Sequence, residues 1–206
     1  MTAPITIIDY GMGNIGSLIN MFRRIGADTV VTAKPDDIAD ARKILLPGVG
    51  AFDAAMTRID ALCLRDVLRH KALEDKVPFF GICLGMQLLT NESEEGEAKG
   101  LGLIPARAIR FPKDAKLKVP HMGWNRVEIA QDTPLTANLP PEPRFYFVHS
   151  YFVQAEKPED VMLRCTYGKT FDAGLCRDNI FGAQFHPEKS HKFGLALLKG
   201  FVGVPC

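Results

Sequence analysis

The feature that most constrains this fold is an apolar segment at residues 77–82 that runs directly into the motif Gly81-Ile82-Cys83-Leu84-Gly85. The apolar segment has the length of a buried strand, and residues 86–90 after the motif have a helical pattern. Glycines on both sides of Cys83 permit a sharp strand-to-helix turn, where neighbouring backbone segments leave no space for larger side chains. This strand-to-helix turn predicts an α/β fold in which the end of one strand presents a cysteine.

Strands and helices alternate along the rest of the N-terminal half. Residues 4–9 form a β-branched run, a glycine-rich turn follows, and apolar residues then recur at helical spacing over residues 15–25. Further strands are expected at residues 28–32 and 43–46, and an amphipathic helix at residues 62–73. This alternation predicts a mostly parallel central sheet flanked by helices on both faces.

The pattern changes after an acidic loop at residues 91–100. Short extended segments separated by turn residues follow, which is typical of antiparallel strands added to the edge or face of the first sheet. A final helix is expected at about residues 192–201. Because no repeat or flexible linker interrupts the chain, we expect residues 1–206 to form a single α/β domain. The expected antiparallel segments are residues 117–120, 125–129, 145–154, 162–167 and 171–176.

Charge and hydropathy argue against two classes of partner. The formal net charge is +1, from 25 basic and 24 acidic residues, so the chain has no overall field for a phosphate backbone and we expect no nucleic acid. No apolar run reaches the roughly 18 residues that span a bilayer, and the N-terminus lacks a signal-peptide pattern. We therefore expect a cytoplasmic protein with no membrane partner.

The cysteines and histidines argue against cross-links and metals. The five cysteines are widely spaced and include no C-x-x-C pair, so neither a disulfide framework nor a zinc ribbon is expected. The histidines lack an H-x-x-x-H pair, and no acidic cluster has the calcium-loop pattern. We expect no metal and no cofactor. Buried structural roles are expected for Cys63, Cys165 and Cys176, since each lies in an apolar run without flanking glycines.

Cys83 is the candidate nucleophile. The predicted turn presents its thiol at the N-terminal end of a helix, where the helix dipole and free N–H groups favour the thiolate form. A thiolate needs a base that moves protons and a third group that orients the base. The motif His186-Pro187-Glu188 supplies both, because Pro187 restricts the backbone and the Glu188 carboxylate can lie beside the imidazole. Taken alone, this motif could also be an ordinary surface turn.

With both motifs in view, the chain resembles the triad-type (class I) glutamine amidotransferases over essentially its whole length. The cysteine turn and the His-Pro-Glu motif are shared by that wider superfamily. Other segments resemble more closely the glutaminase subunits of imidazole glycerol phosphate synthase, an enzyme of histidine biosynthesis. Those segments are residues 8–14, 47–52, 121–125 and 146–151.

The resemblance implies hydrolysis of glutamine to glutamate and ammonia. Cys83 would form a glutamyl thioester. His186, oriented by the carboxylate of Glu188, would protonate the leaving ammonia and then activate water. The backbone N–H of Leu84 would donate to the oxyanion, and Val49 or Gly50 would supply a second donor. The glycines of that loop could also be turn formers only.

The resemblance also implies a glutamine pocket. Gln87 lies one helical turn beyond Cys83 on the same face, so its amide could reach back toward the substrate. Glu95 matches the acidic substrate contact of the family, with Glu92 and Glu94 near enough to leave the choice open. Ser150 and Tyr151 match residues of the pocket wall in the family, and they could equally pair with a neighbouring strand.

A separate partner is expected, because ammonia released into water would be protonated and lost. In the resembled family the partner is a (β/α)₈ cyclase that uses ammonia to form imidazole glycerol phosphate, and the substrate of the cyclase stimulates the glutaminase. Asn14, Trp124 and Lys189 match positions at that interface. Trp124 considered alone would more readily be a core residue.

Three other interpretations stay open from the sequence. The chain could serve another amidotransferase branch, such as anthranilate, guanylate or pyridoxal phosphate synthesis. A cysteine peptidase could share the triad, but the spacing of Gln87 and the tryptophan segment would then be unexplained. A flavodoxin-like binding module could keep a glycine-rich first turn, although residues 11–14 lack the complete G-x-G-x-x-G fingerprint.

Overall fold

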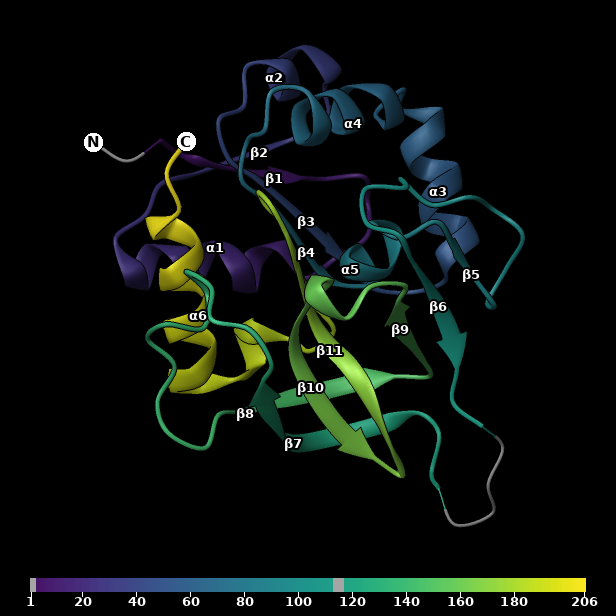
Figure 1. Cartoon of the computed structure of the whole chain (residues 1–206). Helices are drawn as coiled ribbons and strands as arrows, with labels where there is room; N and C mark the ends of the chain where they lie inside the picture. The colour runs from purple at the N-terminus through teal and green to yellow at the C-terminus, as the bar shows by residue number, and fades with distance from the viewer. Residues whose placement is uncertain (1–2, 113–116) are drawn as a thin grey trace.

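The computed structural model describes residues 3–112 and 117–206. A sheet with the strand order β2-β1-β3-β4-β12-β11-β10-β7-β8 forms its centre (Figure 1). The first five strands in this order pair in parallel. They are β2 (Thr29–Thr32), β1 (Ile5–Ile8), β3 (Ile44–Gly48), β4 (Phe79–Cys83) and β12 (Ile180–Ala183).

The remaining strands extend this sheet in antiparallel pairings from the edge of β12. They are β11 (Lys169–Arg177), β10 (Val161–Tyr167), β7 (His121–Ile129) and β8 (Arg144–His149). Off this path, β9 (Tyr151–Ala155) pairs with β11 and with β6 (Ala106–Arg110), which also pairs with β5 (Glu92–Ser93). The predicted α/β class, a parallel sheet with an added antiparallel region in the C-terminal half, is confirmed.

Helices cover both faces of the parallel strands (Figure 1). Helices α1 (Ile15–Ile25) and α6 (His191–Gly203) lie on one face, and α2 (Pro35–Ala39), α3 (Phe52–Ala61) and α4 (Arg65–Leu73) lie on the other. Two short 3₁₀ turns complete the set, η1 (Pro158–Asp160) and η2 (Pro187–Lys189), together with the short helix α5 (Leu84–Leu88). In the part of the chain that the structure describes, no helix is both long and apolar enough to cross a membrane.

Two apolar clusters fill the space between the sheet and its helices. Successive side chains of a strand point to opposite faces, so neighbouring residues join different clusters. Leu45 and Phe80 pack in the cluster that includes α1 and α6, whereas Leu46 and Phe79 pack in the cluster that includes α2, α3 and α4. Burial on both faces explains why these strands consist of consecutive apolar residues rather than alternating ones.

Several predicted boundaries were wrong. The helix predicted at residues 62–73 begins only at Arg65, because the chain turns at Cys63, which has φ 55°, between the end of α3 and the start of α4. Residues 117–120 do not form a strand, since Pro120 has no N–H for pairing. The extended stretch at 145–154 is interrupted at Ser150, and the helix after Cys83 begins at Leu84 rather than at residue 86.

Candidate active site

Cys83 stands at a sharp turn between β4 and α5. Its backbone has φ 55° and ψ −112°, a conformation that non-glycine residues adopt only where the surrounding structure imposes it. Both flanking glycines are required there: a Cβ on Gly81 would lie 2.6 Å from the Gly85 carbonyl oxygen, and a Cβ on Gly85 would collide with the carbonyl of Leu46. The predicted strand-to-helix turn is therefore confirmed.

The other four cysteines occupy different surroundings, and all five are free thiols. Burial raises the pKa of Cys165 to about 12 and that of Cys176 to about 11, so both stay neutral. Cys63 is exposed, which corrects the prediction that it is buried. Within residues 3–112 and 117–206, no group of three or more candidate ligands could hold a metal ion.

His186 and Glu188 form a buried pair at the start of η2. The Nδ1 atom of His186 lies 2.8 Å from Oε1 of Glu188, and their side chains are 4% and 2% exposed. Desolvation lowers the pKa of His186, but its interactions with Cys83 and Glu188 outweigh burial and raise the pKa to about 10. The second ring nitrogen, Nε2, is buried and has no hydrogen-bond partner among the described residues.

Ser190, which was not among the predicted site residues, fixes the backbone that carries this imidazole. Its hydroxyl donates to the His186 carbonyl oxygen at 2.6 Å and accepts from the N–H of Tyr146 at 3.0 Å. The N–H of His186 donates in turn to the carbonyl oxygen of Tyr146 at 2.9 Å. These three bonds tie the His-Pro-Glu segment to β8 and so hold the ring in place.

One cavity of about 350 Å³ brings the predicted residues together, a volume suited to a small molecule. Cys83 and His186 both line it, with Glu188 behind the imidazole. The lining also includes three residues that the sequence did not single out, Pro120, Val148 and His149. The predicted oxyanion and substrate residues that line the cavity are Val49, Gly50, Leu84, Gln87, Glu95, Ser150 and Tyr151.

The loop after β3 lies beside the cysteine because parallel strands end at the same edge. Gly48 is in register with Cys83 across β3 and β4. A Cβ on Gly48 would lie 2.6 Å from Tyr10 Oη and 2.8 Å from the backbone nitrogen of Gly85. Tyr10 donates its hydroxyl to the Pro47 carbonyl at 2.7 Å, and burial raises its pKa, which keeps it a neutral donor. Close packing thus brings this loop to the cavity wall.

The amide of Gln87 does not point freely into the cavity. Its Nε2 donates to Oε1 of Gln184 at 3.1 Å and to the carbonyl oxygen of Tyr151 at 3.2 Å. Gln184 is completely buried, and its own Nε2 lies 4.0 Å from Sγ of Cys83. The amide nitrogen of Gln87 thus binds acceptors of the protein itself, and the contact with Gln184 joins residues that lie 97 positions apart in the sequence.

The structure separates the three acidic candidates. Oε2 of Glu95 accepts the N–H of Phe52 at 2.8 Å, which caps α3 at the cavity. Glu92 pairs with Lys99, and Glu94 accepts the N–H of Arg110, both at 2.8 Å and outside this cavity. Glu95 is therefore the one of the three that lines it.

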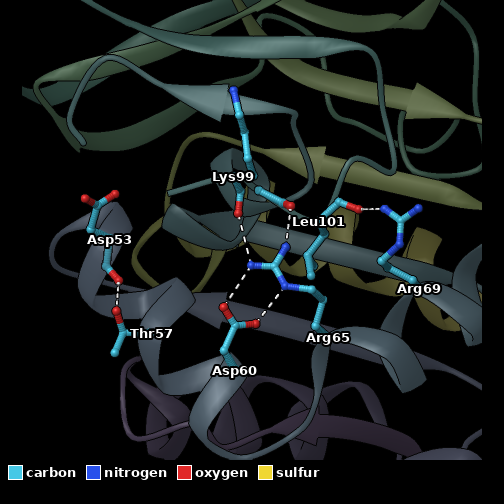
Figure 2. Close-up of polar contacts among 8 residues, drawn as sticks. Asp53, Thr57, Asp60, Arg65, Arg69, Lys99 and Leu101 are labelled. Carbon is cyan, nitrogen blue, oxygen red and sulfur yellow. Dashed lines mark hydrogen bonds and ion pairs between the residues drawn. The ribbon is translucent and has the colours of Figure 1, made fainter. Parts of the chain in front are cut away.

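The segment that carries Glu95 is anchored by two helices (Figure 2). Arg65 pairs with Asp60 and donates to the carbonyl oxygens of Lys99 and Gly100, while Arg69 donates to Leu101. On the other side, the carboxylate of Asp53 in α3 accepts the N–H groups of two residues of the segment, each at 3.0 Å. Side chains of α3 and α4 therefore hold the acidic loop predicted from the sequence in place beside the cavity.

The predicted interface residues lie at the surface. Trp124 is 45% exposed, which contradicts a core role, and its indole stacks on the His191 ring with centroids 5.4 Å apart and an interplanar angle of 2°. Lys189 places Nζ 5.5 Å from the ring centroid of Tyr146, which packs edge-on against the indole. Asn14 is exposed at the start of α1, which follows the carboxyl end of β1.

The family model described as Glutamine amidotransferase class-I matches residues 6–202. The chain belongs to this family. Curated relatives of the amidotransferase include two proteins named Imidazole glycerol phosphate synthase subunit HisH 2. The protein from Methanococcus maripaludis is 50% identical and the one from Pseudomonas aeruginosa 48% identical, each over 96% of this chain and 98% of the relative. The predicted class of enzyme, a cysteine-dependent glutaminase, is confirmed.

Solved structures agree with the fold of the amidotransferase. PurLQS from Thermotoga maritima aligns with a TM-score of 0.76 at 19% identity, covering 98% of both chains. A structure described as a glutamine amidotransferase aligns with a TM-score of 0.74 at 18% identity, covering 97% of this chain and 99% of the other. At these identities the likeness shows the fold alone.

Proposed function

We propose that the chain hydrolyses the side-chain amide of glutamine through a thioester on Cys83 and passes the ammonia to a cyclase subunit of imidazole glycerol phosphate synthase. One observation carries the proposal: a cysteine at a positive-φ turn and an imidazole held by a buried carboxylate line the same small cavity. These are the elements that nucleophilic acyl transfer requires.

In the first half-reaction, Sγ of Cys83 attacks the amide carbon of glutamine and forms a C–S bond. Because Nδ1 of His186 is occupied by Glu188, the proton for the leaving group comes from Nε2. The C–N bond breaks, ammonia leaves, and a glutamyl thioester remains. The raised pKa of His186, about 10, supports a ring that carries this proton at neutral pH.

In the second half-reaction, His186 takes a proton from water at Nε2 while the oxygen adds to the thioester carbon. The C–S bond then breaks and releases glutamate and the Cys83 thiolate, so that glutamine and water have become glutamate and ammonia. Each step passes through an oxyanion. We assign its donors to the backbone N–H of Leu84 and to Val49 or Gly50, since all three residues line the cavity.

We assign the substrate contacts to Glu95, Gln87 and the Ser150–Tyr151 segment of the cavity wall. Glutamine has a cationic amino group, and a carboxylate within the cavity would pair with it. Glu95 is suited to this role, since it lines the cavity and its position is fixed by the bond to Phe52. Gln87 would then act through its carbonyl oxygen and through the residues it binds.

The partner is proposed to be a (β/α)₈ cyclase. The relatives from M. maripaludis and P. aeruginosa are named as subunits of a synthase, and this chain aligns with 98% of each. A surface formed by the exposed residues Trp124, Lys189 and His191 and the half-buried Tyr146 lies next to the His-Pro-Glu segment. Exposed aromatic and cationic side chains are typical of interface hot spots, and we assign this surface, with Asn14, to the cyclase contact.

Glutamate release, measured with and without the candidate cyclase and its nucleotide-derived ligand, tests this function. We expect stimulation of about tenfold or more when both are present, in the range of ordinary allosteric coupling. A Cys83→Ala variant should lose glutamine-supported cyclase activity and keep ammonia-supported activity. Loss of both activities in an intact complex, or no glutamate under any condition, would contradict the proposal.

A further inference from the structure

Two buried histidines behind the glutamine cavity form a chain of hydrogen bonds that the acyl chemistry does not use. His149 lines the cavity, and its Nδ1 lies 2.7 Å from the carbonyl oxygen of Tyr151. Its other nitrogen, Nε2, lies 3.0 Å from Nδ1 of His121 on β7. Nε2 of His121 lies 3.4 Å from Nδ2 of Asn125, which also donates to the Thr166 carbonyl at 2.9 Å.

The ends of this chain fix the tautomer of each ring. The Tyr151 carbonyl can only accept, so Nδ1 of His149 carries a proton and Nε2 of the neutral ring accepts from His121. His121 therefore carries its proton on Nδ1 and accepts at Nε2. Asn125 closes the chain, because its Oδ1 accepts the N–H of Arg126 at 2.9 Å and its amide nitrogen is the donor.

The surroundings keep both rings neutral. His121 lies between Phe147 and Tyr167, with ring centroids at 4.8 Å and 4.0 Å, and Phe111 packs against His149 at 5.2 Å. Burial in this aromatic cluster lowers the pKa of His121 to about 4 and that of His149 to about 3. A second proton on His149, at Nε2, would face the Nδ1–H of His121, and a second proton on His121, at Nε2, would face the amide N–H of Asn125.

The Tyr151 carbonyl joins this chain to the catalytic turn. It accepts from His149 and also from Nε2 of Gln87, so both of its lone pairs are used and its direction is fixed. Gln87 binds Gln184, whose Nε2 faces Sγ of Cys83 at 4.0 Å. The Nδ1–H of His149 therefore holds the Tyr151 carbonyl, and this carbonyl joins the cavity wall to Gln87 in α5.

We propose that His149 is a positioning residue for the glutamine pocket: its neutral ring, held by His121, fixes the Tyr151 carbonyl and through it the Gln87 side chain. The inference rests on the proposed function, since it assigns a residue to that same pocket. It concerns the shape of the pocket and leaves the nucleophile and base unchanged.

Three substitutions at position 149 separate the two bonds of the ring. His149→Asn places an amide near the position of Nδ1 and keeps a donor to Tyr151. His149→Gln places its amide near the position of Nε2 and keeps the contact with His121 only. His149→Phe removes both bonds. His70→Gln is the matched control, because the side chain of His70 is 63% exposed and lies outside the cavity.

Steady-state kinetics with the partner complex provide the first measurement. We expect His149→Gln and His149→Phe to raise the KM for glutamine by about tenfold with kcat within about threefold of wild type, the size of effect that loss of one buried hydrogen bond produces. His149→Asn should restore KM to within about threefold. Equal KM values in all variants, or a fall in kcat with KM unchanged, would overturn the proposal.

Alkylation of Cys83 in the free chain provides a second measurement that does not depend on turnover. A chloroketone analogue of glutamine needs the pocket, whereas iodoacetamide needs only the thiolate. We expect His149→Gln to slow the chloroketone about tenfold and to leave the iodoacetamide rate unchanged, which also reports an intact fold. Parallel loss of both rates would overturn the positioning role.

The wild-type chain separates failure of the inference from failure of the function. If wild type neither turns over glutamine nor reacts with the chloroketone, the proposed function is wrong and the inference falls with it. If wild type reacts and His149→Gln reacts equally fast, only the inference is overturned. Nitrogen NMR of the two rings adds a direct check: protons on both Nδ1 atoms are expected, and a proton on Nε2 of His149 would contradict the chain.

Discussion

The carboxylate of Glu188 lies 2.8 Å from Nδ1 of His186, and both side chains are almost fully buried. A carboxylate in this position occupies one ring nitrogen and leaves Nε2 as the atom that exchanges protons with the reacting groups. Interactions with Cys83 and, second, with this carboxylate raise the pKa of the imidazole despite its burial. The pair therefore sets both the direction and the protonation state of the proposed acid.

This raised pKa predicts a pH dependence of stability. The folded chain holds the His186 proton up to about pH 10, whereas the ordinary pKa is 6.5. The stabilisation is complete below pH 6.5 and is lost as pH rises toward 10. We expect the difference in unfolding free energy between wild type and His186→Gln to shrink steadily over this window in urea titrations. A difference that stays constant from pH 6.5 to 10 would contradict the shift.

The cysteine turn predicts that Gly85 tolerates no side chain. A methyl group there would collide with the Leu46 carbonyl oxygen, so Gly85→Ala should lower the free energy of unfolding by about 3 kcal/mol. Gly16→Ala is the matched control, because it lies in α1 with open space around its Cβ position and should stabilise the chain by about 0.5–1 kcal/mol. Similar effects of both substitutions would contradict the tight turn.

Local sequence was sufficient to predict this turn and the His-Pro-Glu segment. Gly81 and Gly85 are needed within two residues of the cysteine, and the carboxylate of Glu188 lies two residues from the ring it binds. The fold class followed from the alternation of apolar strands and helices. The strand β12 was missed, since four buried residues, Ile-Phe-Gly-Ala, have no periodic pattern of their own.

Contacts between distant segments could not be predicted in the same way. Gln184 meets Gln87 across 97 positions and Ser190 meets Tyr146 across 44, and no spacing rule connects either pair. The exposure of Trp124 was also undecided, because a lone tryptophan is compatible with a core or an interface. Only the folded strand β7 places its indole outside, against His191.

The position of Glu95 in the cavity wall predicts an effect on the KM for glutamine. Glu95→Ala should raise the KM for glutamine by about tenfold or more, because the cavity loses its carboxylate, and should also cost about 1 kcal/mol of stability as α3 loses its cap. Glu94→Ala removes a carboxylate one residue away that binds Arg110 outside the cavity. A larger rise in KM for Glu94→Ala than for Glu95→Ala would show that the wrong residue was selected.

Because Trp124 stacks on His191 at the surface, we predict that its removal weakens binding of the cyclase without lowering the stability of the free chain. Trp124→Ala should change the melting temperature of the free chain by no more than about 2 °C, as for other surface positions. Affinity for the cyclase should fall about thirtyfold, the scale of a hot-spot residue. Val30→Ala, at an exposed position on the far edge strand β2, is the control. A large loss of melting temperature in the free chain would favour a structural role.

The nucleophile itself can be identified by mass spectrometry of the chain after reaction with a chloroketone analogue of glutamine. The thiolate displaces chloride from such a reagent and keeps the glutamine-like group. We predict one adduct, mapped to the peptide that contains Cys83 and suppressed by excess glutamine, although Cys63 and Cys206 are more exposed. Labelling of an exposed cysteine in place of Cys83, or labelling that glutamine does not suppress, would contradict the account.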